Sequence, residues 1–114
     1  MSFIIYHNPR CRKSRETLAI LSDHSGDFEI IEYLKTPLSK SKLKTIIDIL
    51  GITAEQLLRK GESDFKVNFK GKDLSENECL DAMVKFPKLI ERPIVIKGNK
   101  AIIGRPPENV KDLF

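Results

Sequence analysis

Cys11 is the residue whose type and position most clearly point to chemistry. It follows an apolar run at residues 3–6 and the polar turn His7-Asn8-Pro9, and a helix is expected directly after it. A cysteine at the start of a helix meets free backbone amides and the positive end of the helix dipole, and both favour its thiolate. The thiolate is the nucleophilic form of cysteine, so Cys11 is a candidate nucleophile.

Basic side chains gather around Cys11. Lowering a thiol pKa by two units takes about 2.7 kcal/mol, whereas a helix terminus supplies about 0.3 to 2, so a cation or hydrogen-bond donor must add the rest. Residues three and four apart on a helix share a face, which makes the Ser14 hydroxyl and Arg15 the expected neighbours of Cys11. Further candidates nearby are His7, Arg10, Arg12 and Lys13.

The alternative for Cys11 is a small buried apolar side chain, which is the common fate of a free cysteine. Its polar, basic surroundings argue against that reading. Ser14 stands where a Cys-x-x-Cys dithiol would carry its second cysteine. A covalent adduct on Cys11 must therefore be released by a thiol from outside the protein.

Cys79 has a different setting, because it falls in an amphipathic stretch beside Leu80 and one turn before Met83. This spacing predicts a core side chain.

The composition predicts one globular domain that prefers anionic ligands. The 114 residues are 40% hydrophobic and carry a net charge of +4, enough for one core and a mild preference for anions, but not the charge of a nucleic-acid protein. No segment resembles a signal peptide, and no apolar run approaches the roughly 20 residues of a membrane span. With two cysteines far apart in sequence, we expect free thiols in a reducing, cytoplasmic compartment.

The elements around Cys11 follow from hydrophobic pattern and turn residues. Strands are predicted at residues 3–6 and 28–33, with a helix from 14 to about 21 between them. A strand, helix and strand in close succession predict a right-handed crossover with parallel strands.

The middle of the chain is largely helical. Helices are predicted at residues 39–50, 54–59 and 75–86. Gly51 and Gly61 end the first two, and Ser75 with Glu78 forms a capping-box pattern at the start of the third. Residues 62–73 are polar.

In the last part of the chain, two apolar runs at residues 94–96 and 101–103 on either side of Gly98-Asn99 predict a β-hairpin. A short helix is predicted from Pro106 to Phe114. Together these elements predict an α/β fold of one domain, residues 1–114. It is a thioredoxin-like mixed four-stranded sheet with a helical insertion between the second and third strands, at about 37–88.

Four segments resemble the glutaredoxin-dependent arsenate reductase family. They are residues 6–18 (Tyr-His-Asn-Pro-Arg-Cys-Arg-Lys-Ser-Arg-Glu-Thr-Leu), 57–60 (Leu-Leu-Arg-Lys), 91–96 (Glu-Arg-Pro-Ile-Val-Ile) and 104–108 (Gly-Arg-Pro-Pro-Glu). Their order and spacing match the signature segments of that family across essentially the whole chain.

The resemblance implies a reaction and a reductant. In this family a cysteine thiolate attacks arsenate, glutathione forms a mixed thiol adduct, glutaredoxin reduces it, and arsenite is released. No bound cofactor or metal is implied, and glutathione serves as the cosubstrate thiol. The expected partners are arsenate or a similar oxyanion, glutathione and glutaredoxin, with no membrane or direct nucleic-acid contact, and we expect a monomer.

The resemblance also implies site residues. Cys11 matches the nucleophile, His7 the histidine that favours the ionised thiol, and Ser14 the hydroxyl after the nucleophile. Three arginines that bind the oxyanion are implied at Arg59, Arg92 and Arg105. Guanidinium groups suit such anions, because their paired N–H donors match the oxyanion's oxygens. The Arg92–Pro93 bond is expected to be cis.

Three other functional readings can be compared with the sequence. The phosphatase-like class of arsenate reductase needs Cys-x5-Arg, and Thr17 in place of the arginine excludes it. A regulator similar to Spx-type proteins, which contact RNA polymerase, typically carries the Cys-x-x-Cys switch that Ser14 removes. A thiol reductase acting on glutathione mixed disulfides would keep Cys11 and have less need of the arginines.

Overall fold

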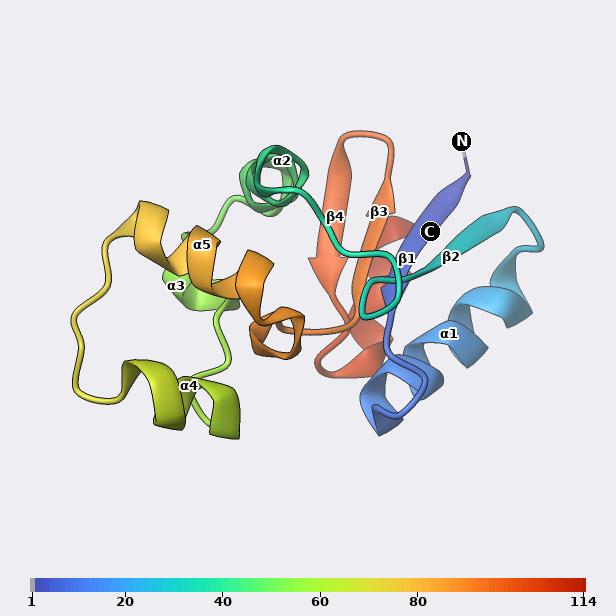
Figure 1. Cartoon of the computed structure of the whole chain (residues 1–114). Coiled ribbons are helices and arrows are strands. Elements are labelled where there is room, and N and C mark those ends of the chain that lie inside the picture. Colours follow the sequence, from blue (N-terminus) through green and yellow to red (C-terminus); the bar gives the residue numbers. More distant parts are fainter. Residues whose placement is uncertain (1) are drawn as a thin grey trace. The chain divides into compact units, whose positions relative to one another are not determined.

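The computed structural model describes residues 2–114, which form two compact units (Figure 1). The sheet unit comprises the chain up to Thr36 together with Arg92–Phe114, and the helical unit comprises Pro37–Glu91. The helical unit occupies the part of the chain where the sequence predicts an insertion at about 37–88. The single-domain organisation stays a prediction.

The sheet unit has four strands in the order β2-β1-β3-β4. They are β1 (Phe3–His7), β2 (Phe28–Glu32), β3 (Ile94–Lys97) and β4 (Lys100–Ile103). β1 pairs in parallel with β2 and antiparallel with β3, and β3 pairs antiparallel with β4 across Gly98-Asn99. This mixed sheet confirms the predicted thioredoxin-like class, the parallel crossover and the hairpin.

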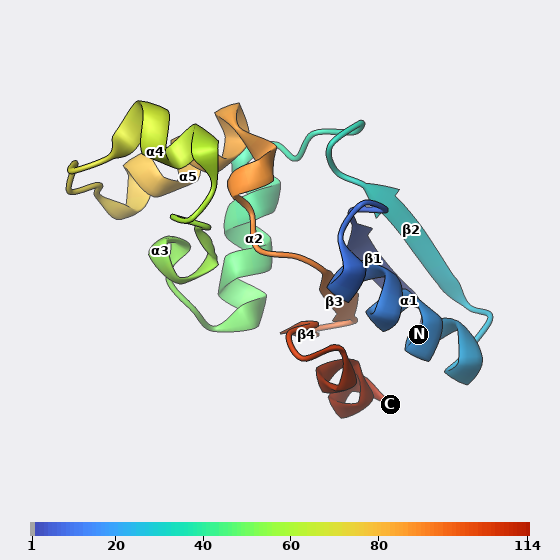
Figure 2. The same cartoon turned by 90° about the horizontal axis from the view of Figure 1, so that it is seen from below.

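One face of the sheet is covered by two helices, as Figure 2 shows. α1 (Arg12–His24) connects β1 to β2, and the 3₁₀ helix η2 (Pro107–Leu113) follows β4. The core between them consists of buried apolar side chains, namely Phe3, Ile5, Leu21, Val95, Val110 and Leu113. Phe3 and Ile5 share a face because side chains alternate along a strand. This packing fixes α1, and therefore its first residues, against the sheet.

Two helices of the helical unit have the capping residues that the sequence predicts. Its elements are α2 (Lys40–Leu50), α3 (Ala54–Leu57), α4 (Ser63–Phe69), α5 (Glu76–Lys85) and the 3₁₀ helix η1 (Pro87–Leu89). The Ser39 side chain caps α2, Gly51 ends it at φ 70°, and Ser75 with Glu78 forms the predicted capping box.

Three element predictions need correction. α1 begins at Arg12, two residues earlier than expected, and continues to His24. α3 ends at Leu57 and not at residue 59, because Leu58 is extended and forms a bridge with Ile90. The polar stretch 62–73 contains α4, whose apolar face is mainly the pair Phe65 and Phe69, with ring centroids 5.7 Å apart. So narrow an apolar face gives little periodic signal.

Within residues 2–114, none of the helices has both the length and the apolar character needed to cross a membrane.

Candidate active site

Cys11 is the N-cap residue of α1. β1 ends at His7, residues 8–11 form a turn, and Cys11 has extended backbone angles (φ −91°, ψ 121°). The Cys11 amide donates to the Asn8 carbonyl oxygen at 3.0 Å, which closes the turn. The residue is 8% exposed. The thiol therefore stands at the helix N-terminus, where the sequence predicts it.

Asn8 organises this turn, and the sequence reasoning missed it. Its side-chain Oδ1 accepts from the Arg10 amide at 3.0 Å, and its own amide donates to Ser14 Oγ at 3.0 Å. Asparagine commonly bonds the backbone two residues on, and Asn-Pro is a turn signal, so the sequence did carry an indication. Asn8 thereby ties the end of β1 to the first turn of α1.

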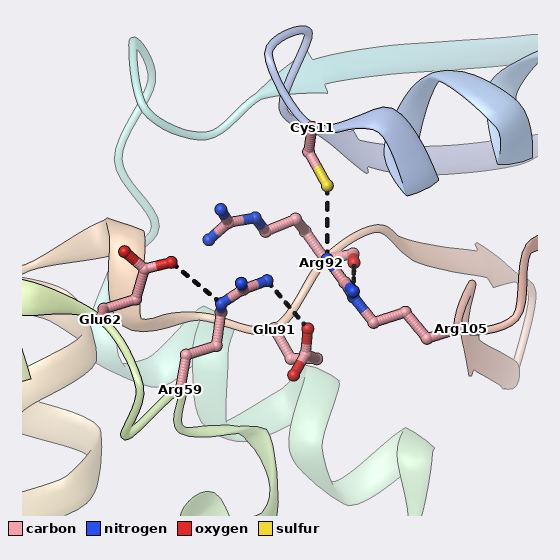
Figure 3. Close-up of polar contacts among 6 residues, drawn as sticks. All are labelled: Cys11, Arg59, Glu62, Glu91, Arg92 and Arg105. Carbon is pink, nitrogen blue, oxygen red and sulfur yellow. Dashed lines mark hydrogen bonds and ion pairs between the residues drawn. The ribbon is translucent and has the colours of Figure 1, made fainter.

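Arg105 reaches Cys11 from the far end of the chain (Figure 3). Its Nη2 lies 3.4 Å from Cys11 Sγ, and its Nε donates to the Arg92 carbonyl oxygen at 2.8 Å. One guanidinium therefore contacts the sulfur and also holds the loop before β3. Arg92 and Arg105, two of the three predicted arginines, lie in the sheet unit with Cys11.

The surroundings of Cys11 favour its thiolate. Burial alone would raise the pKa of the thiol. The Ser14 backbone N–H, a hydrogen bond from the Arg92 side chain and the charges of Arg105 and Arg92 outweigh burial, so that the pKa is lowered. A larger thiolate fraction near neutral pH is what a nucleophilic role requires.

His7 and Ser14 interact with each other. His7 Nδ1 lies 2.6 Å from Ser14 Oγ, and the two residues are 6% and 0% exposed. Burial lowers the pKa of His7, the Glu32 charge opposes this effect, and the Arg15 charge adds to it. The ring is therefore biased towards its neutral form, and an influence of His7 on Cys11 runs through Ser14 rather than through a cation beside the sulfur.

The basic residues next to Cys11 in sequence have other partners. Arg15, expected as a neighbour of the thiol, donates through Nη1 to the Pro9 carbonyl oxygen at 2.9 Å. Arg12 forms an exposed ion pair with Glu16. The cations that lower the thiol pKa come from residues more than 80 positions away.

Arg59 belongs to the helical unit, where two carboxylates hold it. Its Nε lies 3.2 Å from Glu62 Oε1 and its Nη1 lies 3.1 Å from Glu91 Oε1 (Figure 3). Its role as the third oxyanion-binding arginine stays a prediction.

Cys79 is 1% exposed on α5, and burial raises the pKa of its thiol. This setting agrees with the predicted core position. The Arg92–Pro93 peptide bond is cis, as expected, and Arg105–Pro106 is a second cis bond that was not expected. Among residues 2–114, no cluster of three or more histidine, cysteine or acidic side chains could hold a metal ion.

Comparisons with known proteins give the family. The model of the ArsC family matches residues 6–113. A protein of Haemophilus influenzae named arsenate reductase is 48% identical, and the match covers 100% of both chains. A protein of Escherichia coli K12 named uncharacterized protein YfgD is 47% identical over 96% of this chain and 93% of its own.

A solved structure named arsenate reductase, from Vibrio cholerae, has a TM-score of 0.93 and 42% identity, covering 100% of this chain and 98% of that one. The agreement in sequence and in backbone extends over the sheet unit and the helical unit alike. The chain belongs to the ArsC family.

Proposed function

We propose that this chain is an arsenate reductase that uses the Cys11 thiolate as its nucleophile. The observation that carries the proposal is the guanidinium of Arg105 at 3.4 Å from Cys11 Sγ, with its orientation fixed by the Arg92 carbonyl oxygen. A thiolate beside guanidinium donors suits attack on a tetrahedral oxyanion, because the same donors can hold its oxygens. Relatives named arsenate reductase support this substrate.

The first step forms a bond between Cys11 Sγ and As(V). One arsenate oxygen takes up protons and leaves as water. Arg92 and Arg105 would bind the remaining oxygens and reduce the repulsion between the anionic thiolate and the anionic substrate. The oxidation state of arsenic does not change in this step, so the reducing electrons must come from elsewhere.

Glutathione and glutaredoxin are the proposed source of those electrons. Glutathione condenses with the adduct, forming a second S–As bond and releasing water. A glutaredoxin thiolate then attacks the glutathione sulfur, a mixed disulfide forms, and the electron pair of the broken S–As bond reduces As(V) to As(III). Water displaces Cys11 and releases arsenite. An external thiol is needed because Ser14 stands where a Cys-x-x-Cys motif would carry its second cysteine.

His7 and Ser14 complete the proposed catalytic set. Their 2.6 Å contact joins the end of β1 to the first turn of α1, and the Ser14 backbone N–H separately lowers the pKa of Cys11. Arg59 is proposed as the third oxyanion-binding arginine. We further propose a cytoplasmic monomer that needs no metal or bound cofactor, with glutathione as cosubstrate.

The test is a coupled assay with purified protein, arsenate, glutathione and glutaredoxin, in which released arsenite is measured. We expect turnover by the wild type, none by Cys11→Ser and a large loss in Arg92→Ala. Omitting glutathione or glutaredoxin in turn identifies the electron donor. Cys79→Ser is the matched control for Cys11→Ser and should keep its activity, because Cys79 is buried with a raised thiol pKa and so does not supply a nucleophile.

A wild type that releases no arsenite would refute the arsenate reaction. The same protein should then be tested on a glutathione mixed disulfide. Turnover there that needs Cys11 and survives Arg92→Ala would identify a thiol reductase instead.

A further inference from the structure

Three segments of the sheet unit meet at Thr17, Pro93 and Gly104. Thr17 lies on α1 and is 0% exposed, and its Oγ1 donates to the Lys13 carbonyl oxygen at 2.8 Å. Pro93 precedes β3, and Gly104 follows β4 and donates its amide to the Pro93 carbonyl oxygen at 2.9 Å. Both are buried. These segments carry Cys11, Arg92 and Arg105 respectively, so the contact joins the three parts of the site.

Gly104 leaves no room for a side chain. A Cβ at this position would fall against Thr17 Oγ1 and would lie 2.7 Å from Pro93 Cγ and 3.0 Å from Thr17 Cγ2. Neither neighbour yields easily, because the proline ring is rigid and the branched Thr17 side chain has restricted rotamers in a helix.

The backbone of Gly104 does not itself require glycine. The glycines with positive φ are Gly51, Gly71 and Gly98, and Gly104 is not among them. What Gly104 provides is therefore the close approach of the β4 end to α1, and not an unusual backbone conformation.

The position of Gly104 sets that of the next residue. Arg105 donates its amide to the Ile103 carbonyl oxygen at 2.8 Å, and its guanidinium contacts Cys11 Sγ and the Arg92 carbonyl oxygen. We propose that Gly104 and Thr17 are positioning residues that hold Arg105 against the Cys11 sulfur. A shift of the backbone away from α1 would lengthen the 3.4 Å contact between Arg105 Nη2 and Cys11 Sγ and weaken the contribution of the Arg105 charge to the lowered thiol pKa.

The first test compares Gly104→Ala with Gly26→Ala. Gly26 lies in the same unit, and a Cβ added there would meet no atom within 4 Å, so it gives the same chemical change without a clash. Alkylation of Cys11 by iodoacetamide is followed against pH, with the Cys11 peptide identified by mass spectrometry. We expect the reactivity profile of Gly104→Ala to move to higher pH and that of Gly26→Ala to match the wild type. A folded Gly104→Ala with the wild-type profile would overturn the proposal.

The second test asks whether Gly104 acts through Arg105. In an Arg105→Ala background, Gly104→Ala should shift the profile no further, because the contact is already lost. Additive shifts would show a general disturbance of the site and would contradict the proposal.

Rescue provides the third test. Thr17→Ala removes the two Thr17 atoms against which the new Cβ falls. The alkylation profile of the double variant Gly104→Ala/Thr17→Ala should therefore lie nearer the wild-type profile than that of Gly104→Ala. A double variant shifted as far as Gly104→Ala would contradict the packing argument. If Gly104→Ala does not fold, the single variant Thr17→Ala tests the proposal. The gap left by the smaller side chain should also move the alkylation profile of Cys11 to higher pH. An unchanged profile would overturn the proposal.

An activity measurement extends the proposal to substrate binding, and this arm rests on the proposed arsenate reduction. In Gly104→Ala we expect the KM for arsenate to rise by about tenfold with a smaller change in kcat, as for a weakened charge-assisted hydrogen bond to an anion. A KM equal to that of the wild type in a folded variant would contradict this extension. If the wild type reduces no arsenate, the proposed function fails, while the alkylation tests still decide the positioning roles.

Discussion

His7 and Ser14, seven residues apart, are joined across the turn that carries Cys11, with His7 Nδ1 2.6 Å from Ser14 Oγ. The same Oγ accepts from the Asn8 amide at 3.0 Å. The Ser14 hydroxyl is therefore engaged on the side of β1, and it is the Ser14 backbone N–H that lowers the pKa of Cys11. The hydroxyl supports the turn, while the amide acts on the sulfur.

Ser14→Ala should separate these two effects. The variant keeps the amide but leaves the buried His7 ring and the Asn8 N–H without their shared partner, which should cost about 1 to 3 kcal/mol of unfolding free energy. The pH profile of Cys11 alkylation should hardly move. Urea unfolding and alkylation measure the two quantities, and Ser22→Ala on the same helix is the control, because Ser22 is exposed and its hydroxyl donates to the Ala19 carbonyl oxygen. A large shift of the alkylation profile would show that the hydroxyl itself stabilises the thiolate.

His7 should make stability depend on pH in the weakly acidic range. Burial lowers the pKa of His7 in the folded state, so the unfolded chain binds a proton more readily. The contribution of the neutral ring is present above about pH 6.5, the unfolded value, and is lost as pH falls through the lower folded value. Unfolding free energies measured against pH should fall less steeply in His7→Asn than in the wild type. Parallel curves would show that His7 titrates equally in both states.

The pH dependence of Cys11 reactivity should respond to Arg105. Burial raises the pKa of the thiol. The Ser14 amide, Arg92 and the Arg105 charge together have the larger opposite effect, so the pKa is lowered. Removing the Arg105 charge should therefore raise the pKa, and the alkylation profile of Arg105→Ala should move to higher pH. Arg105→Lys keeps the charge but cannot make both contacts of the guanidinium, so its alkylation profile should lie between those of the wild type and Arg105→Ala. Arg12→Ala, which removes an exposed arginine paired with Glu16, should leave the profile unchanged.

The sequence predicts the elements that carry local signals. The strand, turn and helix around Cys11, the capping box at Ser75 and the hairpin at Gly98-Asn99 all follow from residues close together in the chain. α4 escapes prediction because its apolar face is little more than Phe65 and Phe69.

The arginines at the thiol could not be found by local reasoning. Arg105 is 94 positions from Cys11, and only the family resemblance points to it. The packing of Thr17 on Gly104, 87 positions apart, gives no periodic signal at all, since it depends on the absence of a side chain. Helix spacing predicts Arg15 beside the thiol, whereas its guanidinium donates to the Pro9 carbonyl oxygen.

The two cysteines should differ sharply in reactivity. Burial raises the pKa of Cys79, and the residue is 1% exposed on α5, whereas the pKa of Cys11 is lowered. In the folded protein, iodoacetamide at neutral pH should modify Cys11 and leave Cys79 unmodified, and Cys79 should react only after denaturation. Peptide mass spectrometry of protein labelled before and after unfolding measures both sites. Rapid labelling of Cys79 in the folded state would contradict the core position.

Arg59 offers a test of the third predicted oxyanion ligand, because its charge is already shared by two carboxylates. Arg59→Ala should cost about 1 kcal/mol of unfolding free energy, since both ion pairs are partly exposed. If Arg59 also binds arsenate, the KM should rise by about tenfold, the loss expected for one charge-assisted hydrogen bond to an anion. The assay for arsenite release and urea unfolding measure the two effects separately.

Glu91→Gln sharpens that test, because it keeps the shape of the side chain and removes one of the two negative charges that compete with an anion for Arg59. An oxyanion-binding Arg59 predicts a lower KM for arsenate in Glu91→Gln and a higher one in Arg59→Ala. Lys60→Ala is the control, since it breaks the exposed neighbouring pair with Glu55 and should change neither KM nor stability appreciably. A lower stability with unchanged KM in Arg59→Ala would assign Arg59 to the structure of the helical unit, and the oxyanion would then be held by Arg92 and Arg105 alone.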